Sequence, residues 1–310
     1  MDFATKRIRF FSLLSFCLIG TFFLACETVI NPTLQPAVPV LVVDAWINNK
    51  PQKQVVVLTQ TQPYFNDAQP VGVSGATVTV QDLTNNASYT FAENPSTKGS
   101  YEWTPSTATF GTIGHAYRLS ITVNGEVFEA ASRMGRVPPI DSVTFSLDQN
   151  NRSSKTVRYI GEFWATDPKG TGDTYWIKTV KNDTLLNLPN EINTAYDAGF
   201  SAGGDADGVV FIPPIRRKIT PTNSSTTPDR SPFNPGDSVY VEIHSITLAA
   251  FNYLGEVVTQ TNRPGGFSEL FAKPMANVST NVTNTNPKGS AVVGFFNVAA
   301  VHGRGTKFIK

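Results

Sequence analysis

Residues that could carry chemistry are few and widely spaced in this sequence. The 310-residue chain has three histidines, His115, His244 and His302, and two cysteines, Cys17 and Cys26. A zinc site needs three or four nitrogen, sulfur or carboxylate ligands, and no paired spacing here supplies them. The patterns Gly-x-Ser-x-Gly, Ser-x-x-Lys and the P-loop are also missing from the sequence. The sequence therefore predicts no catalytic residue, no metal site and no cofactor, and we expect the histidines to be structural.

One acidic stretch has a partial metal-binding pattern. Asp205-Ala206-Asp207-Gly208 resembles half of a calcium loop, but a third ligand and the distal glutamate are missing. A solvated turn is the expected structure. Asp167, Asp173 and Asp197 could add oxygen ligands only if the fold brings them close together.

The second cysteine has a different chemistry, because it ends an export-like segment. Lys6, Arg7 and Arg9 precede the uncharged run from residue 10 to residue 25. Sixteen residues in a helix span roughly 24 Å, which is short for a hydrocarbon core of roughly 30 Å. The end of the run, Leu24-Ala25-Cys26, resembles the bacterial lipobox, in which the thiol receives diacylglycerol and the new N-terminus a further acyl chain such as palmitate. An uncleaved anchor or an ordinary signal peptide is the alternative.

This pattern predicts where the protein resides. We expect residues 1–25 to be a lipoprotein signal peptide, Cys26 to be lipidated, and residues 26–39 to be an extended tether rich in proline. The expected location is the outer membrane, with the periplasmic and surface faces both left open. Several acyl chains would hold the protein there essentially permanently.

Charge and cysteine content limit the class of the remaining 285 or so residues. The whole chain has 25 basic and 24 acidic residues, and the signal removes three and one of these, leaving a net charge near −1. No basic face for nucleic acid is implied. With Cys17 removed and Cys26 acylated, no disulfide can form, so the fold depends on its hydrophobic core. Charged residues are only 16 %, as in exported β proteins with long polar loops.

Residues 40–136 carry the pattern of a β-sandwich domain. Residues 76–82 alternate between Ala or Val on one face and Thr or Gln on the other, and Asn124-Gly125 is a strong hairpin signal. The expected strands are 40–47, 53–61, 76–82, 88–92, 99–103, 116–123 and 126–131. The segments 73–80, 99–101 and 114–119 resemble the transthyretin-like or carboxypeptidase-regulatory-like sandwich, whose exported examples are mostly structural or binding units.

A second β-rich domain is expected over residues 137–310, after the stiff Pro138-Pro139 pair. Its expected strands are 141–147, 156–166, 173–181, 209–212 and 239–245, followed by one amphipathic helix over 246–258. A late strand over 289–300, broken at Gly294, and a closing segment over 306–309 complete it. The fold class is therefore mainly β, with two sandwich-like domains, the second having long loops and one short helix.

Aromatic residues are the remaining candidates for binding. Tyr64 and Phe65 lie in a predicted loop beside Asn66 and Asp67, so we expect them to form an exposed ligand-binding patch. The four tryptophans could stack on sugars, although aromatic residues on strands more often belong to the core; they are Trp46, Trp103, Trp164 and Trp176.

Taken together, the order of motifs resembles a Bacteroidota lipoprotein family known as domain of unknown function 4249. The matching segments are Cys26, 40–47, 73–80, 137–143, 234–239 and 293–296. The resemblance implies an accessory or uptake role beside a TonB-dependent outer-membrane receptor, with no catalytic residues. We therefore expect a non-enzymatic binding protein that contacts the membrane through its lipid. A surface adhesin or glycan-binding module, and an unrecognised hydrolase, are the alternatives.

Overall fold

The computed structural model describes residues 38–63, 66, 68–106, 108–149, 158–221 and 231–309, and residues 39–310 form one compact unit. The chain is mainly β, which confirms the predicted fold class. Within the described ranges, no helix combines the length and apolar character that a bilayer crossing requires. Cys26, Tyr64 and Phe65 lie outside the described residues, as does most of the expected tether.

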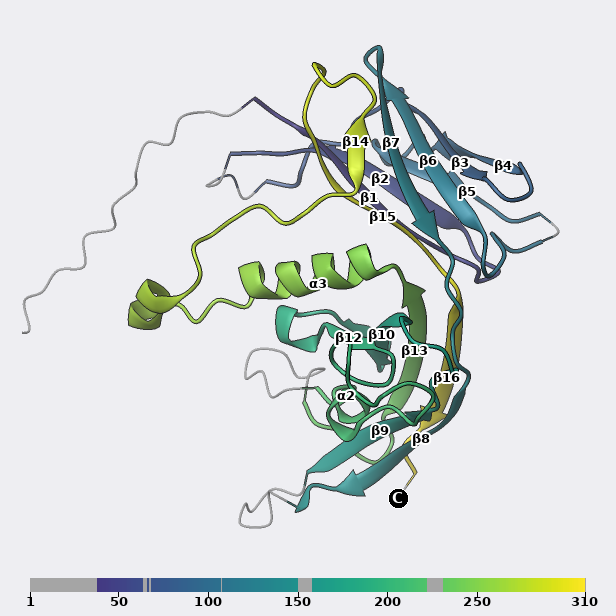
Figure 1. Cartoon of the computed structure of the whole chain (residues 1–310). Helices are drawn as coiled ribbons and strands as arrows, with labels where there is room; N and C mark the ends of the chain where they lie inside the picture. Colours follow the sequence, from purple (N-terminus) through teal and green to yellow (C-terminus); the bar gives the residue numbers. More distant parts are fainter. Residues whose placement is uncertain are drawn as a thin grey trace, which may run out of the picture. The chain divides into compact units, whose positions relative to one another are not determined.

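Among the described residues, sixteen strands make up three sheets (Figure 1). The strands are β1 (Leu41–Asn48), β2 (Gln54–Gln60), β3 (Thr77–Asp82), β4 (Ser88–Glu93), β5 (Ser100–Trp103), β6 (Ala116–Val123), β7 (Glu126–Arg133), β8 (Ile140–Leu147), β9 (Tyr159–Ala165), β10 (Thr174–Lys181), β11 (Thr184–Leu186), β12 (Asn193–Tyr196), β13 (Ser238–Ile246), β14 (Val282–Asn284), β15 (Val292–Ala299) and β16 (Val301–Lys307). The helices are η3 (Pro189–Glu191), α2 (Pro213–Arg217), α3 (Leu248–Thr261) and η5 (Gly266–Phe271).

The nine-stranded first sheet has the order β14-β7-β6-β3-β4-β5-β2-β1-β15. Its seven N-terminal strands, β1 to β7, lie where the sequence predicted the sandwich strands, which confirms them. Alternate side chains along each strand point to opposite faces, so that one set is buried. Val78 and Val80 of β3 are fully buried, while Thr77 is exposed. Asn124 and Gly125 both have positive φ, at 51° and 78°, as a two-residue hairpin turn between β6 and β7 requires.

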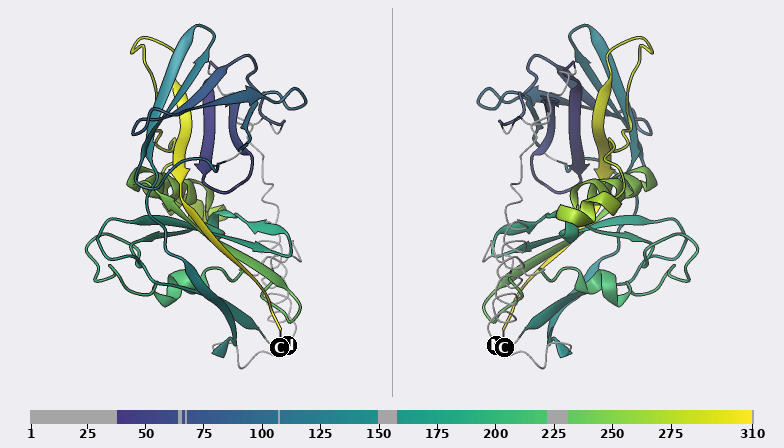
Figure 2. Two further views of the ribbon diagram at one scale, coloured as in Figure 1. Left: turned by 90° about the vertical axis from the view of Figure 1, so that its right-hand side faces the viewer. Right: turned by 90° about the vertical axis from the view of Figure 1, so that its left-hand side faces the viewer.

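The C-terminal part of the chain returns to this first sheet. β15 pairs in parallel with β1, and Figure 2 shows the yellow strand beside the purple one. The predicted break at Gly294 is wrong, because β15 runs through it with φ at +110° and the Val43 carbonyl only 1.9 Å from where a Cβ would stand. Glycine is needed for close approach, and the strand continues. The expected boundary at residue 137 thus separates β7 from β8, while β14 and β15 belong to the first sheet.

The five-stranded second sheet has the order β11-β10-β13-β16, with β12 also paired to β10. The strand predicted over residues 209–212 is wrong: this segment forms an isolated bridge between Val210 and Thr166, with two flanking backbone hydrogen bonds, and α2 begins at Pro213. Two consecutive prolines start this helix, where their missing N–H groups cost nothing. The closing strand is Val301–Lys307 rather than 306–309, and β8 pairs with β9 in a separate hairpin.

The helix α3 packs where the two sheets meet. Thr247 caps its N-terminus by accepting a hydrogen bond from the Ala250 N–H at 3.2 Å. Its buried side chains, Ala250 and Leu254, join Phe295 of β15 and Ile246 of β13 in a small apolar cluster. The amphipathic helix predicted over 246–258 is therefore confirmed, and its observed start and end at 248 and 261 lie two and three residues later than predicted.

Candidate functional site

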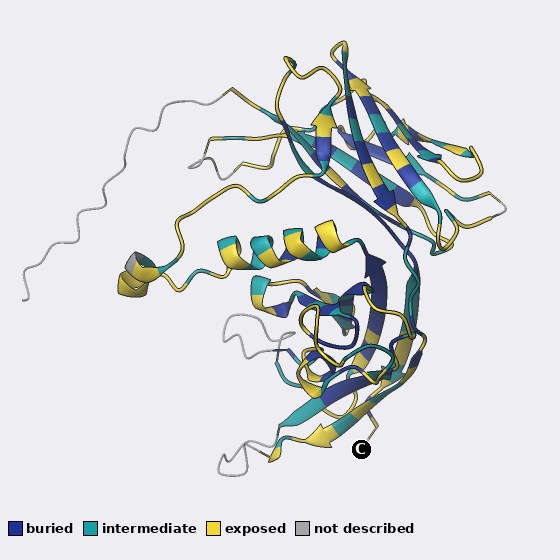
Figure 3. Cartoon of the chain, in the orientation of Figure 1, coloured by how far each residue is buried: buried dark blue, intermediate teal, exposed yellow. Residues whose placement is uncertain are grey.

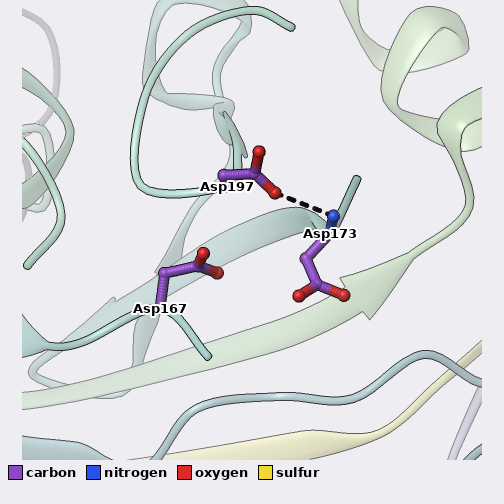
Figure 4. Close-up of side chains that lie close together, drawn as sticks. All are labelled: Asp167, Asp173 and Asp197. Carbon is purple, nitrogen blue, oxygen red and sulfur yellow. Dashed lines mark hydrogen bonds between the residues drawn. The ribbon is translucent and has the colours of Figure 1, made fainter. Parts of the chain in front are cut away.

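Three aspartates that are distant in sequence converge at one edge of the second sheet. Asp167 follows β9, Asp173 precedes β10 and Asp197 follows β12, and one carboxylate oxygen from each lies within 4.8 Å of the others (Figure 4). The topology explains this: Thr174 and Tyr196 are register partners, so the residues just beyond them face each other. The sequence analysis considered these three residues as additional oxygen ligands on the condition that the fold brought them together, and the fold does so.

Hydrogen bonds hold each carboxylate in place. Asp197 accepts from the N–H groups of Gly172 and Asp173, both at 2.9 Å. Asp167 accepts from the Tyr175 hydroxyl at 2.6 Å and from the Gly208 N–H at 3.2 Å. Asp173 accepts from the Arg136 guanidinium at 2.7 Å. The cluster is therefore a fixed arrangement, with Arg136 as its nearest cation.

Burial makes this cluster unfavourable for negative charge. Desolvation raises the pKa of Asp167 and of Asp173 above the ordinary range, and the hydrogen bonds from Tyr175 and Arg136 offset only part of this. Desolvation and the neighbouring carboxylates also raise the pKa of Tyr175, which keeps it a hydrogen-bond donor. The arrangement could hold a proton or supply three oxygen ligands to a hard cation such as Ca²⁺, which prefers six to eight.

The two aspartates of the acidic stretch noted in the sequence are not members of this group, although Gly208 at the end of the stretch donates its N–H to Asp167. Asp207 accepts a hydrogen bond from the Gly170 N–H at 2.7 Å, and Asp205 is exposed. Asp207 thus supports the loop between β9 and β10, as a turn residue does.

A cleft of about 590 Å³ opens beside Asp173, where the link from β7 to β8 approaches the N-terminus of α3. It is lined by Ile113, Gly114, Arg133, Met134, Gly135, Arg136, Gly170, Thr171, Gly172, Asp173, Thr174, Ser245, Ile246, Thr247 and Leu248. Its volume lies in the range of small-molecule sites. None of these lining residues is a histidine, cysteine or lysine.

Arg136 fixes one wall of the cleft. Besides its bond to Asp173, it donates to the Lys169 carbonyl at 2.8 Å, to the Pro168 carbonyl at 3.3 Å and to the Gly170 carbonyl. One side chain therefore ties the loop between β9 and β10 to the link after β7. Because hydrogen bonds already hold this wall in place, it loses little conformational entropy when a ligand binds.

None of the three histidines lines the cleft, although His115 and His244 are each next in sequence to a lining residue, Gly114 and Ser245. His115 contacts Asp82 at 2.7 Å, His244 contacts Glu242 at 2.8 Å, and His302 accepts the Ile140 N–H at 3.0 Å. Each therefore has a contact within the fold, and their structural role stays a prediction.

A second polar cluster brings Asp44 of β1 close to Lys178 of β10 and Glu242 of β13. The Lys178 ammonium sits 3.8 Å from the centre of the Trp176 ring, and burial lowers the pKa of Lys178 to about 8, although Glu242 and Asp44 favour its charged form. Desolvation by neighbouring atoms raises the pKa of Asp44 and Lys178 lowers it in part, although Asp44 as a whole residue is exposed. Sequence reasoning missed this cluster, because β1 and β10 belong to different sheets and no local signal indicates that their side chains meet.

The four tryptophans do not form a row. Trp46 and Trp176 pack edge to face with centroids 5.1 Å apart, Trp103 packs on Tyr89, and Trp164 lies under Arg216. All four are half-buried.

One family model matches the chain: the family described as Domain of unknown function (DUF4249) matches residues 27–304, nearly the whole sequence after Cys26. No curated protein matches the chain.

Proposed function

Because the chain belongs to the DUF4249 family, whose description names no activity, we propose its function from its anchor sequence and its cleft. The protein is a non-enzymatic binding component, held on the outer membrane by acyl chains on Cys26. It serves as an accessory of a TonB-dependent receptor, retaining a ligand for uptake. The lipobox-like segment Leu24-Ala25-Cys26 supports the anchor.

The cleft is the observation that carries the binding role. It has the volume of a small-molecule site, and both polar and apolar residues line it. Arg136 holds its wall through a carboxylate and three carbonyl groups. Fixed polar groups in a small cleft favour selective binding, since they need not reorganise.

The two alternatives draw less support from the geometry. Hydrolysis needs an acid–base pair beside the substrate, but the His115–Asp82 and His244–Glu242 pairs do not line the cleft. Of the three grouped aspartates only Asp173 lines the cleft, and it is paired with Arg136. A glycan platform would use a row of exposed aromatic rings, and the tryptophans occupy separate clusters.

The first experiment isolates the native protein from membranes in mild detergent and identifies its N-terminal peptide and its companions by mass spectrometry. Acylated Cys26 together with a TonB-dependent receptor is the expected result, and Cys26→Ala should release the protein from the membrane. Acylated Cys26 without a companion would refute the accessory role and leave an independent binding module. An N-terminal peptide without lipid would refute the anchor.

The cleft itself is tested with a filling variant. Thr171 lines the cleft and is exposed, so Thr171→Trp should occupy the space without disturbing the core. We expect native mass spectrometry to show loss of any co-purifying small molecule, while acylation and the receptor companion are retained. Val71→Trp, at an exposed site outside the cleft lining, is the matched control. Unchanged ligand retention in Thr171→Trp would place binding elsewhere.

A further inference from the structure

The segment after α3 leaves two phenylalanines almost wholly in water. Phe267 and Phe271 of η5 are 77 % and 80 % exposed, and their rings pack edge to face with centroids 5.7 Å apart. Met275, four residues on, is 61 % exposed. These three residues are called the Phe267–Met275 patch below. Isolated exposed apolar side chains are common, but a local group of large ones marks an interaction surface.

Local contacts hold the patch in position. Gly265 and Gly266, with φ of 66° and 55°, turn the chain out of α3 into η5. Arg263 pairs with Glu269 and donates to the Lys273 carbonyl at 2.9 Å, which joins the two ends of the segment. Figures 1 and 3 show η5 beyond the C-terminal end of α3, with mostly exposed residues. The phenyl rings are thus presented outward on a braced projection.

The charge around the patch fits a phospholipid surface. Lys273 is exposed between Phe271 and Met275 in the sequence, whereas the charge of Arg263 at the base of the segment is matched by Glu269. Aromatic and aliphatic side chains enter the boundary between headgroups and acyl chains, while neighbouring cations remain at the phosphates. A projecting apolar group suits this soft interface.

The chain outside the described structure brings the bilayer within reach. Only twelve residues, 27–38, separate Cys26 from the compact unit that begins at Pro39. Such a tether spans at most about 43 Å when fully extended and about 20 Å on average as a flexible coil. A compact unit of this length has a radius of gyration of about 19 Å. Lipid on Cys26 would therefore hold the patch at distances from which it can touch the membrane.

We propose that the Phe267–Met275 patch is a second membrane contact, which inserts into the leaflet that holds the acyl chains of Cys26. The inference rests on the lipid anchor of the proposed function and extends it. One attachment point lets the fold rotate freely, whereas two restrain it. The patch thereby sets the orientation of the cleft relative to the bilayer.

The test uses the polypeptide from Glu27 to Lys310, which has no acyl chain and contains the whole compact unit. Binding to vesicles of phosphatidylethanolamine and phosphatidylglycerol is measured by sedimentation. Phe267→Ser/Phe271→Ser should lower the partition coefficient by about 10- to 100-fold, since two phenyl groups lose their burial. Ile309→Ser removes a single side chain that is 83 % exposed and should change little. Lys273→Gln should weaken binding only when phosphatidylglycerol is present.

Circular dichroism and thermal unfolding confirm that the variants fold, which is expected because the substituted rings are exposed. Absence of vesicle binding by the unsubstituted polypeptide, or equal binding by the double variant, would overturn the proposal. So would a double variant that keeps its vesicle binding but loses a protein companion, or changes from dimer to monomer. The lipid state of Cys26 in the native protein tests the anchor separately, so the two failures are distinguishable.

Discussion

Acidification from pH 7 to pH 5 should destabilise the protein through His244. This residue of β13 is 6 % exposed, and its Nε2 atom contacts a Glu242 oxygen at 2.8 Å. Burial lowers the pKa of His244 to about 4, with the nearby cations Lys178 and Lys50 acting in the same direction and Glu242 opposing them. The neutral imidazole therefore donates to Glu242, whose own pKa is lowered to about 2 by hydrogen bonds from His244 and Lys50, against its burial.

The magnitude follows from the two protonation equilibria. An unfolded histidine has a pKa of about 6.5, and the folded value is lower, so the stabilisation is present above pH 6.5 and is lost as the pH falls toward 4. Between pH 7 and pH 5 this amounts to about 2 kcal/mol, or roughly 4 to 6 °C in Tm for a chain of this length. The raised pKa values of Asp44, Asp167 and Asp173 act with the opposite sign at lower pH.

The assay is urea denaturation at pH 7, 6 and 5 for the natural protein and for His244→Gln. The glutamine amide can still donate to Glu242 but cannot titrate, so the pH slope should fall by about one proton in the variant. Imidazole resonances followed by NMR give an independent pKa for His244. Equal slopes in the two proteins, or a His244 that titrates near 6.5, would refute the reasoning.

Three substitutions and one labelling experiment test other parts of the structure. Gly294→Ala should lower the free energy of unfolding, measured by urea denaturation, by at least about 3 kcal/mol, because the added Cβ would collide with the Val43 carbonyl of β1. Gly255→Ala, where the added Cβ on α3 meets no other atom, should instead raise it by about 0.5 to 1 kcal/mol. Arg136→Gln removes the cation beside Asp173. Because the Arg136 side chain is 41 % exposed, solvent screens this ion pair, and we expect the free energy of unfolding to fall by only about 1 kcal/mol. A decrease of more than about 3 kcal/mol would show that solvent does not screen the pair. Lys178 should titrate near pH 8, so competitive acetylation should show half-maximal reactivity there, and an ordinary lysine profile would contradict its burial.

Local sequence signals account for most of the first sheet. Alternation in β3, the Asn124-Gly125 turn and the short polar connections each act over a few residues, so strands and hairpins can be predicted from them. The threonine cap at Thr247 is also a local signal, and it places the start of α3 at Leu248, two residues later than the hydrophobic periodicity predicted. The candidate site is different: Asp167, Asp173 and Asp197 were recognisable as possible ligands, but not as neighbours.

The sequence alone determined the class of the protein: an export-like N-terminus ending at Cys26, a β-rich chain, a balanced net charge and a match to the DUF4249 family. Only the tertiary structure decided which strands pair and which distant side chains become neighbours. The parallel pairing of β1 with β15 joins residues about 250 positions apart, and the convergence of the three aspartates depends on how β10 and β12 align. Periodicity records which face of a strand is buried, whereas the choice of a distant partner depends on how whole faces pack together.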